Sequence, residues 1–157
     1  MNMEELKKQI EELQKQVALL EGGCKRWKAG YGETYYYICS DGDIFFNTEK
    51  NSEFSTTNYD LGNYFQTKEE AKKTFEKIKI YTQLKDLALR LNNGEEIDWE
   101  NGNQIKYFIY YENRYKKIFT TAACWSKDLG QIYCLDKNFL DVAKQKIGEA
   151  NLKKLFE

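Results

Sequence analysis

The chain has 157 residues, of which 41% are hydrophobic, so it can bury one modest core. Its net charge is −1, from 24 basic and 25 acidic residues, which excludes a general electrostatic attraction of the whole chain to nucleic acid or acidic membranes. It contains no histidine, which excludes histidine-dependent catalytic triads and HExxH zinc sites. It also lacks a glycine-rich phosphate-binding loop, so we expect neither enzymatic activity nor a cofactor.

The first twenty residues carry a heptad pattern. Apolar residues recur at alternating steps of three and four, at Met3, Leu6, Ile10, Leu13, Val17 and Leu20. β-Branched residues at two a positions and leucine at every d position favour a parallel two-stranded coiled coil. We therefore predict a homodimerisation helix over residues 1–21, with an interface formed by Leu6, Ile10, Leu13, Val17 and Leu20. The alternative is an amphipathic helix that packs on its own domain.

Gly22 and Gly23 end this helix, because paired glycines satisfy its last carbonyls and provide a hinge. A globular domain is expected over residues 24–157. The predicted fold class is α+β, in which the N-terminal coiled-coil helix is followed by antiparallel β-hairpins and packed helices.

The first half of the domain predicts a hairpin and a long helix. The expected elements are two hairpin strands, a polar loop, a short strand and the helix, at 33–39, 44–47, 47–59, 62–66 and 68–91. Aromatic and β-branched runs flank Asp41 and Gly42, the pattern of a tight hairpin turn. Asp41 and Asp43 could form a catalytic carboxylate pair, but a turn explains them more simply. Thr67 and Glu70 form a capping box at the start of the helix.

The second half of the domain repeats this order. After a polar loop that starts at Gly94, the expected elements are three strands and two helices, at 105–111, 115–121, 131–135, 136–147 and 151–156. Aligning Thr67 with Asp136 places apolar helix positions on apolar ones, which favours a weak internal duplication with possible halves 24–93 and 94–157. The alternative is coincidence between two ordinary β-then-α units.

The 12 tyrosines are concentrated in the predicted strands, where they place rings on both faces of a sheet. One face can then form the core while the other stays partly exposed, and exposed rings suit contact with protein or nucleobases. The alternative is that the rings only pack across strands and cover loops. Basic residues accompany the rings only at 114–117. The candidate partner-binding residues are Tyr35, Tyr37, Tyr110, Arg114, Lys116 and Lys117.

Four cysteines lie far apart in the sequence, at Cys24, Cys39, Cys124 and Cys134, and form no C-x-x-C pair. This spacing predicts reduced thiols and no zinc site. No apolar run has the length of a membrane span or the form of a signal peptide, so we expect the protein to stay in the cytoplasm.

Several motifs together carry a family resemblance. They are Glu33-Thr-Tyr-Tyr-Tyr-Ile38, Asp41-Gly-Asp-Ile44, Gly62-Asn-Tyr-Phe-Gln-Thr-Lys-Glu-Glu-Ala71, Asp98-Trp99 and Ile147-Gly-Glu149. With these motifs the chain resembles, over most of residues 27–150, a family of small uncharacterised phage and prophage proteins of low-GC Gram-positive bacteria. Members of that family often carry a short N-terminal coiled coil.

The resemblance implies a viral origin and supplies no catalytic residues. Small phage proteins without catalytic machinery often bind host proteins. The expected function is therefore that of a non-enzymatic protein that binds and inhibits a host macromolecule in the host cytoplasm, such as an anti-CRISPR or other counter-defence inhibitor. The alternative is a nucleic-acid or nucleotide-binding module that uses the tyrosine-rich sheet. Expected partners are a second copy of the chain and a host protein, with nucleic acid as the alternative and no membrane.

Overall fold

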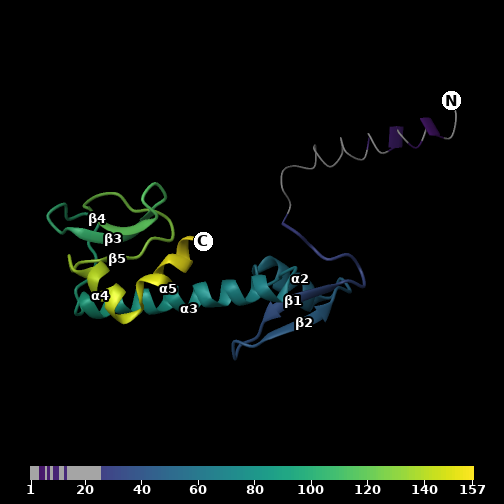
Figure 1. Cartoon of the computed structure of the whole chain (residues 1–157), viewed down its shortest axis with the longest axis horizontal. Helices are drawn as coiled ribbons and strands as arrows, with labels where there is room; N and C mark the ends of the chain where they lie inside the picture. The colour runs from purple at the N-terminus through teal and green to yellow at the C-terminus, as the bar shows by residue number, and fades with distance from the viewer. Residues whose placement is uncertain (1–3, 6, 8, 11–12, 14–25) are drawn as a thin grey trace. The chain divides into compact units, whose positions relative to one another are not determined.

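The computed structural model describes residues 4, 5, 7, 9, 10, 13 and 26–157 (Figure 1). The chain divides into two compact units, which we call unit 1 (Met1–Lys68) and unit 2 (Glu69–Glu157). The predicted halves meet at residues 93 and 94, whereas the boundary between the units falls at Lys68. Within the part of the chain that the structure describes, no helix combines the length and the apolar composition needed to cross a membrane.

The predicted dimerisation helix falls mostly outside the described residues. Leu6, Val17 and Leu20 are among the residues that the structure does not describe. Ile10 and Leu13 are helical, and both side chains are exposed. The described residues show no coiled coil, so the pairing of two N-terminal helices stays a prediction.

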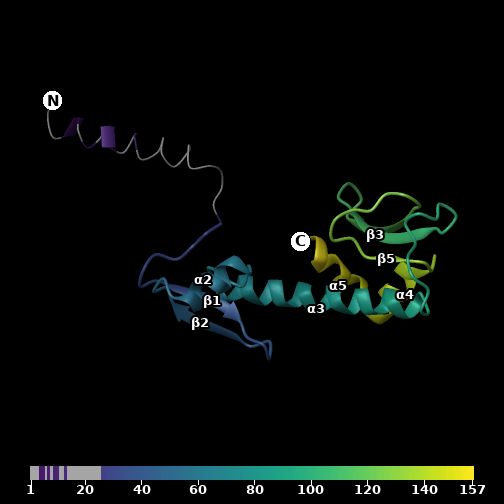
Figure 2. The same ribbon diagram turned by 180° about the vertical axis from the view of Figure 1, so that it is seen from behind.

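Unit 1 contains an antiparallel hairpin of β1 (Thr34–Ile38) and β2 (Ile44–Thr48), visible from behind in Figure 2. The turn between the strands has the predicted chemistry. Gly42 adopts a φ of 88°, and the Asp41 carboxylate accepts a hydrogen bond from the backbone N–H of Asp43 at 3.1 Å. Asp41 and Asp43 are therefore turn residues, as the simpler interpretation predicts.

Two predicted elements of unit 1 need correction. The strand expected over residues 62–66 is reduced to an isolated antiparallel bridge between Phe65 and Tyr36. The polar loop expected over residues 47–59 is also wrong, because it contains helix α2 (Glu53–Asp60).

The buried side chains of helix α2 are polar, which is why the helix shows no apolar periodicity in the sequence. The Ser52 hydroxyl accepts a hydrogen bond from the backbone N–H of Ser55 at 3.2 Å and caps the helix. The buried residues of the helix are Ser55 and Asn58, and the Asn58 side chain donates to the Phe54 carbonyl at 3.0 Å. A hydrophobic pattern could not have revealed a helix whose buried side chains are polar.

The core of unit 1 is small and aromatic. Tyr35 and Tyr64 stack with ring centroids 4.0 Å apart, and Ala29 is buried beside them. The partly buried rings of Trp27 and Tyr59 pack around this pair, with centroids 5.8 and 5.4 Å from that of Tyr64. Tyrosines in this unit therefore form the core.

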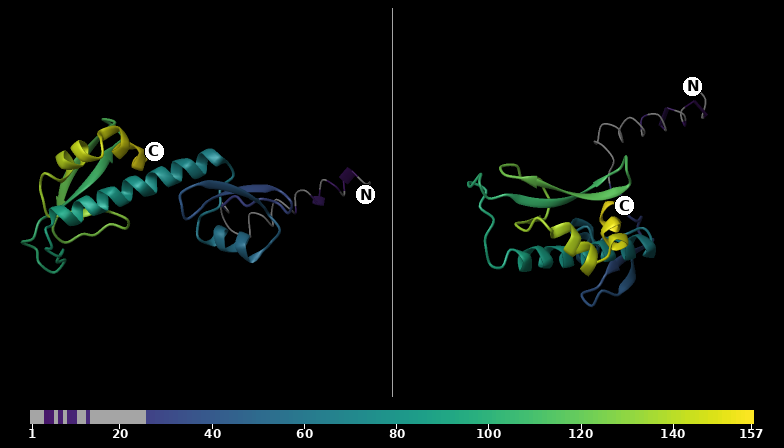
Figure 3. Two further views of the ribbon diagram at one scale, coloured as in Figure 1. Left: turned by 90° about the horizontal axis from the view of Figure 1, so that it is seen from below. Right: turned by 60° about the vertical axis from the view of Figure 1, so that its left-hand side comes forward.

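Unit 2 combines a three-stranded antiparallel sheet with helices on one side of it (Figure 3). In spatial order the strands are β4 (Lys117–Ala123), β3 (Lys106–Glu112) and β5 (Tyr133–Cys134). The helices are α3 (Lys68–Leu91), α4 (Phe139–Lys146) and α5 (Glu149–Lys153), and a 3-10 turn η1 (Lys154–Phe156) follows. The bounds of α3 are those predicted from the capping box and the apolar stripe.

The core of unit 2 is mainly aliphatic. Ile80, Leu84 and Ala88 recur every four residues along α3 and form one buried stripe. The buried residues packed with this stripe are Ile109, Ile118, Cys134, Phe139, Leu140, Ala143 and Leu152. These side chains fix the hairpin of β3 and β4 to the helices from one side.

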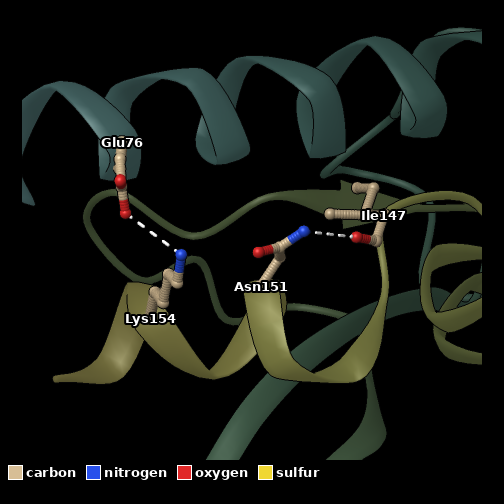
Figure 4. A network of polar contacts seen from close by, with 4 residues as sticks. All are labelled: Glu76, Ile147, Asn151 and Lys154. Atoms are coloured by element: carbon tan, nitrogen blue, oxygen red, sulfur yellow. Dashed lines mark hydrogen bonds and ion pairs between the residues drawn. The ribbon is translucent and has the colours of Figure 1, made fainter.

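The C-terminal segment is attached to α3 by apolar and ionic contacts. The buried side chain of Leu152 belongs to the core, and the Lys154 ammonium lies 3.1 Å from the Glu76 carboxylate of α3 (Figure 4). The Asn151 side chain donates to the Ile147 carbonyl at 2.9 Å where α4 passes into α5. Because the ion pair is exposed, it contributes at most about 1 kcal/mol, and the burial of Leu152 contributes more.

The two sheets share one strand order. In unit 1, β1 pairs with β2 on one side and bridges Phe65 through Tyr36 on the other. In unit 2, β3 pairs with β4 on one side and with β5 on the other, where Tyr107 opposes Cys134. A helix follows the short third segment in both cases. Helix α2 lies between β2 and Phe65 and has no counterpart between β4 and β5, and the internal duplication stays a prediction.

Candidate functional site

The β3–β4 hairpin turns one face toward the helices and the other away from them. Ile109 lies in the aliphatic core, and Tyr111 stacks on Phe156 with ring centroids 5.6 Å apart. Because side chains alternate along a strand, Phe108 and Tyr110 lie on the opposite face. In the right-hand view of Figure 3 the helices of unit 2 lie on one side of β3 and β4. We call the other side, which carries Phe108 and Tyr110, the outer face.

Five rings form a continuous aromatic row on this outer face: Tyr133, Phe108, Tyr110, Phe119 and Tyr115. The distances between successive ring centroids are 5.4, 6.4, 5.9 and 6.3 Å. Tyr133 is only 6% exposed, whereas Tyr115 is 60% exposed. The row therefore begins inside the unit and ends at the surface, and only its Tyr115 end is open to a partner.

Three cations lie at the open end of the aromatic row, and we call them the basic tip: Arg114 and Lys116 in the turn, and Lys117 at the start of β4. All three are exposed, and none forms an ion pair within the described part of the chain. The Arg114 guanidinium lies 5.7 Å from the centroid of the Tyr115 ring. The Glu112 carboxylate accepts a hydrogen bond from the backbone N–H of Arg114 at 3.2 Å. The tip therefore places charge beside an exposed ring.

The buried end of the row is closed by Trp99. Its ring meets that of Tyr133 edge-on with centroids 4.8 Å apart, and the ammonium groups of Lys106 and Lys127 lie 5.4 and 5.8 Å from its centroid. Lys106 is fully buried, and its ammonium donates to the carbonyls of Asn101 and Cys124 at 3.0 and 3.2 Å. Two carbonyls and an indole face offset the cost of burying this cation, so Lys106 fixes the loops around Trp99.

A pocket of about 540 Å³ also borders Trp99, between α3 and the loops before β3 and β5. Its apolar lining includes Tyr81, Leu89, Ile97 and Tyr133. Its polar lining mixes cations and carboxylates, from Lys85, Lys127, Glu95 and Glu96. Because these charges have both signs, the pocket favours no single class of ligand.

The structure brings together four of the six predicted partner-binding residues. Tyr110, Arg114, Lys116 and Lys117 all belong to the β3–β4 hairpin, at the open end of the row. The turn of the hairpin spans residues 113–116, so β4 starts two residues later than predicted.

The prediction for Tyr35 is wrong. Its side chain is 0% exposed, stacks on Tyr64, and donates a hydrogen bond from its hydroxyl to Ser55 Oγ at 3.3 Å. Tyr37 is half-buried, and its ring packs edge-on against that of Phe54 at 5.2 Å. Both residues belong to unit 1 and lie outside the candidate site.

The sequence interpretation missed Phe119 and Tyr115, which complete the open end of the row. The signal was present in the alternation of β4. Once Tyr110 opposes Phe119 in the hairpin register, the two rings must share a face. The sequence alone does not give the register between β3 and β4, because this register depends on the turn at residues 113–116.

Unit 1 contains a buried carboxylate, a feature that catalytic sites often share. Glu49 is 1% exposed, and its carboxylate accepts hydrogen bonds from the Tyr64 hydroxyl and the Asn51 backbone N–H, both at 2.6 Å. Burial alone raises the pKa of Glu49, but the hydrogen bonds from Tyr64, Asn51 and Ser55 and the charge of Lys28 together outweigh it and leave this pKa below its usual value. Burial and the adjacent Glu49 carboxylate raise the pKa of Tyr64. Glu49 is thus a structural anion.

Three of the four cysteines lie in the part of the chain that the structure describes. Cys39, Cys124 and Cys134 are free, and Cys24 falls outside the described residues. Burial raises the pKa of Cys134, which disfavours its reactive thiolate form. In the described part of the chain, no three cysteine, aspartate or glutamate side chains gather closely enough to hold a metal ion.

Comparison of the chain with protein-family models, with curated proteins and with solved structures gives no match. The resemblance to phage and prophage proteins therefore stays a prediction. The outer face has to be interpreted from its own geometry and charge.

Proposed function

We propose that this chain is a non-enzymatic phage protein that binds and inhibits a host macromolecule, as an anti-CRISPR or other counter-defence inhibitor. The observation that carries the proposal is the open end of the aromatic row beside the basic tip. These side chains belong to the β3–β4 hairpin, whose opposite face packs against the helices of unit 2. We assign the contact with the partner to this surface.

The arrangement of the surface supports a role in binding. Tyr110, Phe119 and Tyr115 offer apolar area at small entropic cost, because an aromatic side chain has few torsions to fix. Arg114 and Lys116 surround these rings with charge, which matches the apolar centre and polar rim of protein interfaces. Because the aliphatic core already fixes the hairpin, binding requires little further ordering.

The chemistry of the same surface favours binding over catalysis. Glu112 is the carboxylate at the tip, and it accepts a hydrogen bond from the backbone of the turn. In the described part of the tip no lysine or arginine forms an ion pair with this carboxylate, and its contact is with the backbone of the turn.

We further propose that the N-terminal helix pairs two copies of the chain. Replacing Leu13 and Val17 together with Asp places charges in the predicted seam, which costs several kcal/mol and abolishes pairing. Light scattering of the wild type and the double variant measures this directly. A wild type that is already monomeric at the assay concentration would rule out the homodimer.

Titration tests the inhibitory function. A blocking protein is consumed one-for-one with its target, so cleavage by a guide-loaded CRISPR effector from a Gram-positive host should fall linearly and end at equivalence. Tyr115→Ala should weaken inhibition about tenfold, because it removes an exposed anchor ring. Tyr31→Ala is the matched control, since Tyr31 is an exposed tyrosine of unit 1. The Leu13 and Val17 double variant should also lose potency, because it presents one surface in place of two.

Each other result has a definite meaning. Full inhibition at a few per cent of the effector concentration contradicts the proposal and indicates catalysis. Equal potency of Tyr115→Ala and Tyr31→Ala would exclude the outer face as the contact. Unchanged cleavage at a large excess of protein would refute inhibition of that effector.

A further inference from the structure

We infer that the outer face binds single-stranded nucleic acid through Tyr115 and Phe119 together with the basic tip. The inference rests on the proposed function in one respect, namely that this surface makes the contact. It names the chemical class of the partner, which the proposed function leaves open.

The open end of the aromatic row supplies the apolar part of such a site. Tyr115 is 60% exposed, and its ring meets the half-buried ring of Phe119 at nearly a right angle, 75°. Tyr110 extends the row inward, with its centroid 5.9 Å from that of Phe119. Bases that have left a duplex stack on aromatic side chains whatever their sequence, because every base has a π-face. The row therefore offers a stacking platform for a few adjacent bases.

The basic tip supplies the complementary charge. Arg114, Lys116 and Lys117 lie within four positions of each other, and in the described part of the chain none is engaged in an ion pair. The Arg114 guanidinium is 5.7 Å from the Tyr115 centroid, so one nucleotide can place its base on the ring and its phosphate on the guanidinium. Glu112 is the opposing charge, and its carboxylate faces the backbone N–H of Arg114. The tip therefore carries a net charge of +2, from three cations and one carboxylate.

These features favour a single strand over a duplex. A ring can stack only on a base whose face is free, and paired bases hide their faces inside the helix. The whole chain has a net charge of −1 and no general attraction to nucleic acid, but the cations of the tip are concentrated at one place. Phosphates respond mainly to charges within about one Debye length, about 8 to 10 Å, so the net charge of the whole chain does not exclude contact with the three cations of the tip.

The number of cations in the tip predicts how strongly nucleic-acid binding should depend on salt. Three phosphate contacts on a single strand give a slope of log K against log salt of about −2, from about −0.7 for each contact. A tenfold increase in salt should therefore weaken binding about a hundredfold. Sequence preference should be slight, because stacking and phosphate contacts carry little sequence information.

Fluorescence anisotropy of the full chain with a labelled oligo-dT of 12 nucleotides tests the inference, with the matching dT·dA duplex as the comparison. We expect the single strand to bind at least tenfold more tightly than the duplex. Tyr115→Ala should weaken binding about tenfold or more, and Tyr115→Phe should retain it, because stacking needs the ring. Lys116→Gln should reduce the magnitude of the salt slope by about 0.7. Lys146→Gln, an exposed lysine at the end of α4, is the control and should leave the slope unchanged.

The outcomes separate this inference from the proposed function. No binding of the oligonucleotide in low salt, equal binding of the duplex, or equal slopes for the Lys116 and Lys146 variants would overturn the inference. If Tyr115→Ala then still loses inhibition in the effector titration, the proposed function stands and the partner is a protein. Binding of the oligonucleotide without inhibition of the effector would support the inference and refute inhibition of that effector.

Discussion

The two hairpins share a strand order but use their tyrosines in opposite ways. In unit 1, Tyr35 points inward and stacks on Tyr64, and the core around them is made of rings and polar groups. In unit 2, the inward positions of β3 and β4 meet an aliphatic core, and Tyr110 and Phe119 stand on the outer face. A strand tyrosine thus lies in the core of unit 1 at Tyr35 and on the outer face of unit 2 at Tyr110.

The difference follows from what covers each hairpin. Helix α2 buries Ser55 and Asn58, so the side chains beneath it must offer hydrogen bonds, and the tyrosine hydroxyl does so. Helix α3 buries an aliphatic stripe, which is matched best by Ile109 and other apolar side chains. Strand composition alone therefore does not decide whether a tyrosine is buried, because the covering helix decides it.

The largest expected effect comes from breaking the aliphatic core. Phe139→Ala removes a fully buried ring from unit 2 and should lower the free energy of unfolding by about 3 to 5 kcal/mol. Hydrogen exchange resolved by peptide should accelerate in β3, β4 and α4. Peptides of β1 and β2 should be unchanged if each hairpin depends on its own core. Equal acceleration of hydrogen exchange in both units would show that the two cores unfold together, and would contradict the view that each hairpin depends on its own core.

The polar core of unit 1 should respond to the loss of one charge. Glu49→Gln replaces one carboxylate oxygen by an amide N–H₂, so the Tyr64 hydroxyl or the Asn51 N–H loses its buried acceptor. The free energy of unfolding should fall by about 2 kcal/mol, with faster exchange in β1, β2 and α2. Glu76→Gln is the control, because its exposed ion pair with Lys154 contributes at most about 1 kcal/mol. A smaller loss for Glu49→Gln than for Glu76→Gln would contradict the structural role of Glu49.

The stability of unit 1 should also depend on pH through Glu49. The folded pKa of Glu49 is lower than that of an unfolded carboxyl group, so the unfolded state binds a proton more readily. The ionised Glu49 carboxylate therefore contributes its full stabilisation above the usual carboxyl pKa. This stabilisation is lost as the pH falls through the pKa of Glu49 in the folded state. Unfolding curves between neutral and acidic pH should show this loss for the wild type and a weaker dependence for Glu49→Gln. The same pH dependence in both proteins would exclude Glu49 as its source.

Much of the fold could be predicted from the sequence, because several elements have local signals. Helix α3 has a capping box and a stripe with a helical period, and the β1–β2 turn carries Asp41-Gly42. Elements and helix starts without such a local signal could not be found in this way. Helix α2 depends on hydrogen bonds of Ser55 and Asn58, and α4 begins at Phe139, three residues after the predicted cap at Asp136.

The candidate site could be predicted only where it is local. Arg114, Lys116 and Lys117 adjoin each other in the sequence, so their order along the chain is enough to indicate a basic turn. The assignment of Tyr35 required knowledge of which face α2 covers, and that depends on contacts between residues about twenty positions apart. The pairing of Tyr110 with Phe119 required the register, which slips by one position when a turn residue is misplaced.

The smallest expected effect concerns single hydroxyl groups and gives the sharpest test of the contrast. The Tyr35 hydroxyl donates to Ser55 and accepts from the Asn47 side chain, each at 3.3 Å, inside the core of unit 1. Tyr35→Phe removes both hydrogen bonds and should lower the free energy of unfolding by about 1 kcal/mol.

Tyr110→Phe is the matched change on the outer face of unit 2. Tyr110 is half-buried, and its ring contacts with Phe108 and Phe119 survive the substitution. The free energy of unfolding should change by no more than about 0.5 kcal/mol, as for ordinary surface substitutions. Urea titration of the two single variants and of the double variant measures both changes in the free energy of unfolding, and the double variant should show their sum because the two residues belong to different units. Equal losses in the free energy of unfolding for the two variants would mean that the two tyrosine hydroxyls have similar surroundings. This result would contradict the assignment of the outer face as a surface that is free to bind a partner.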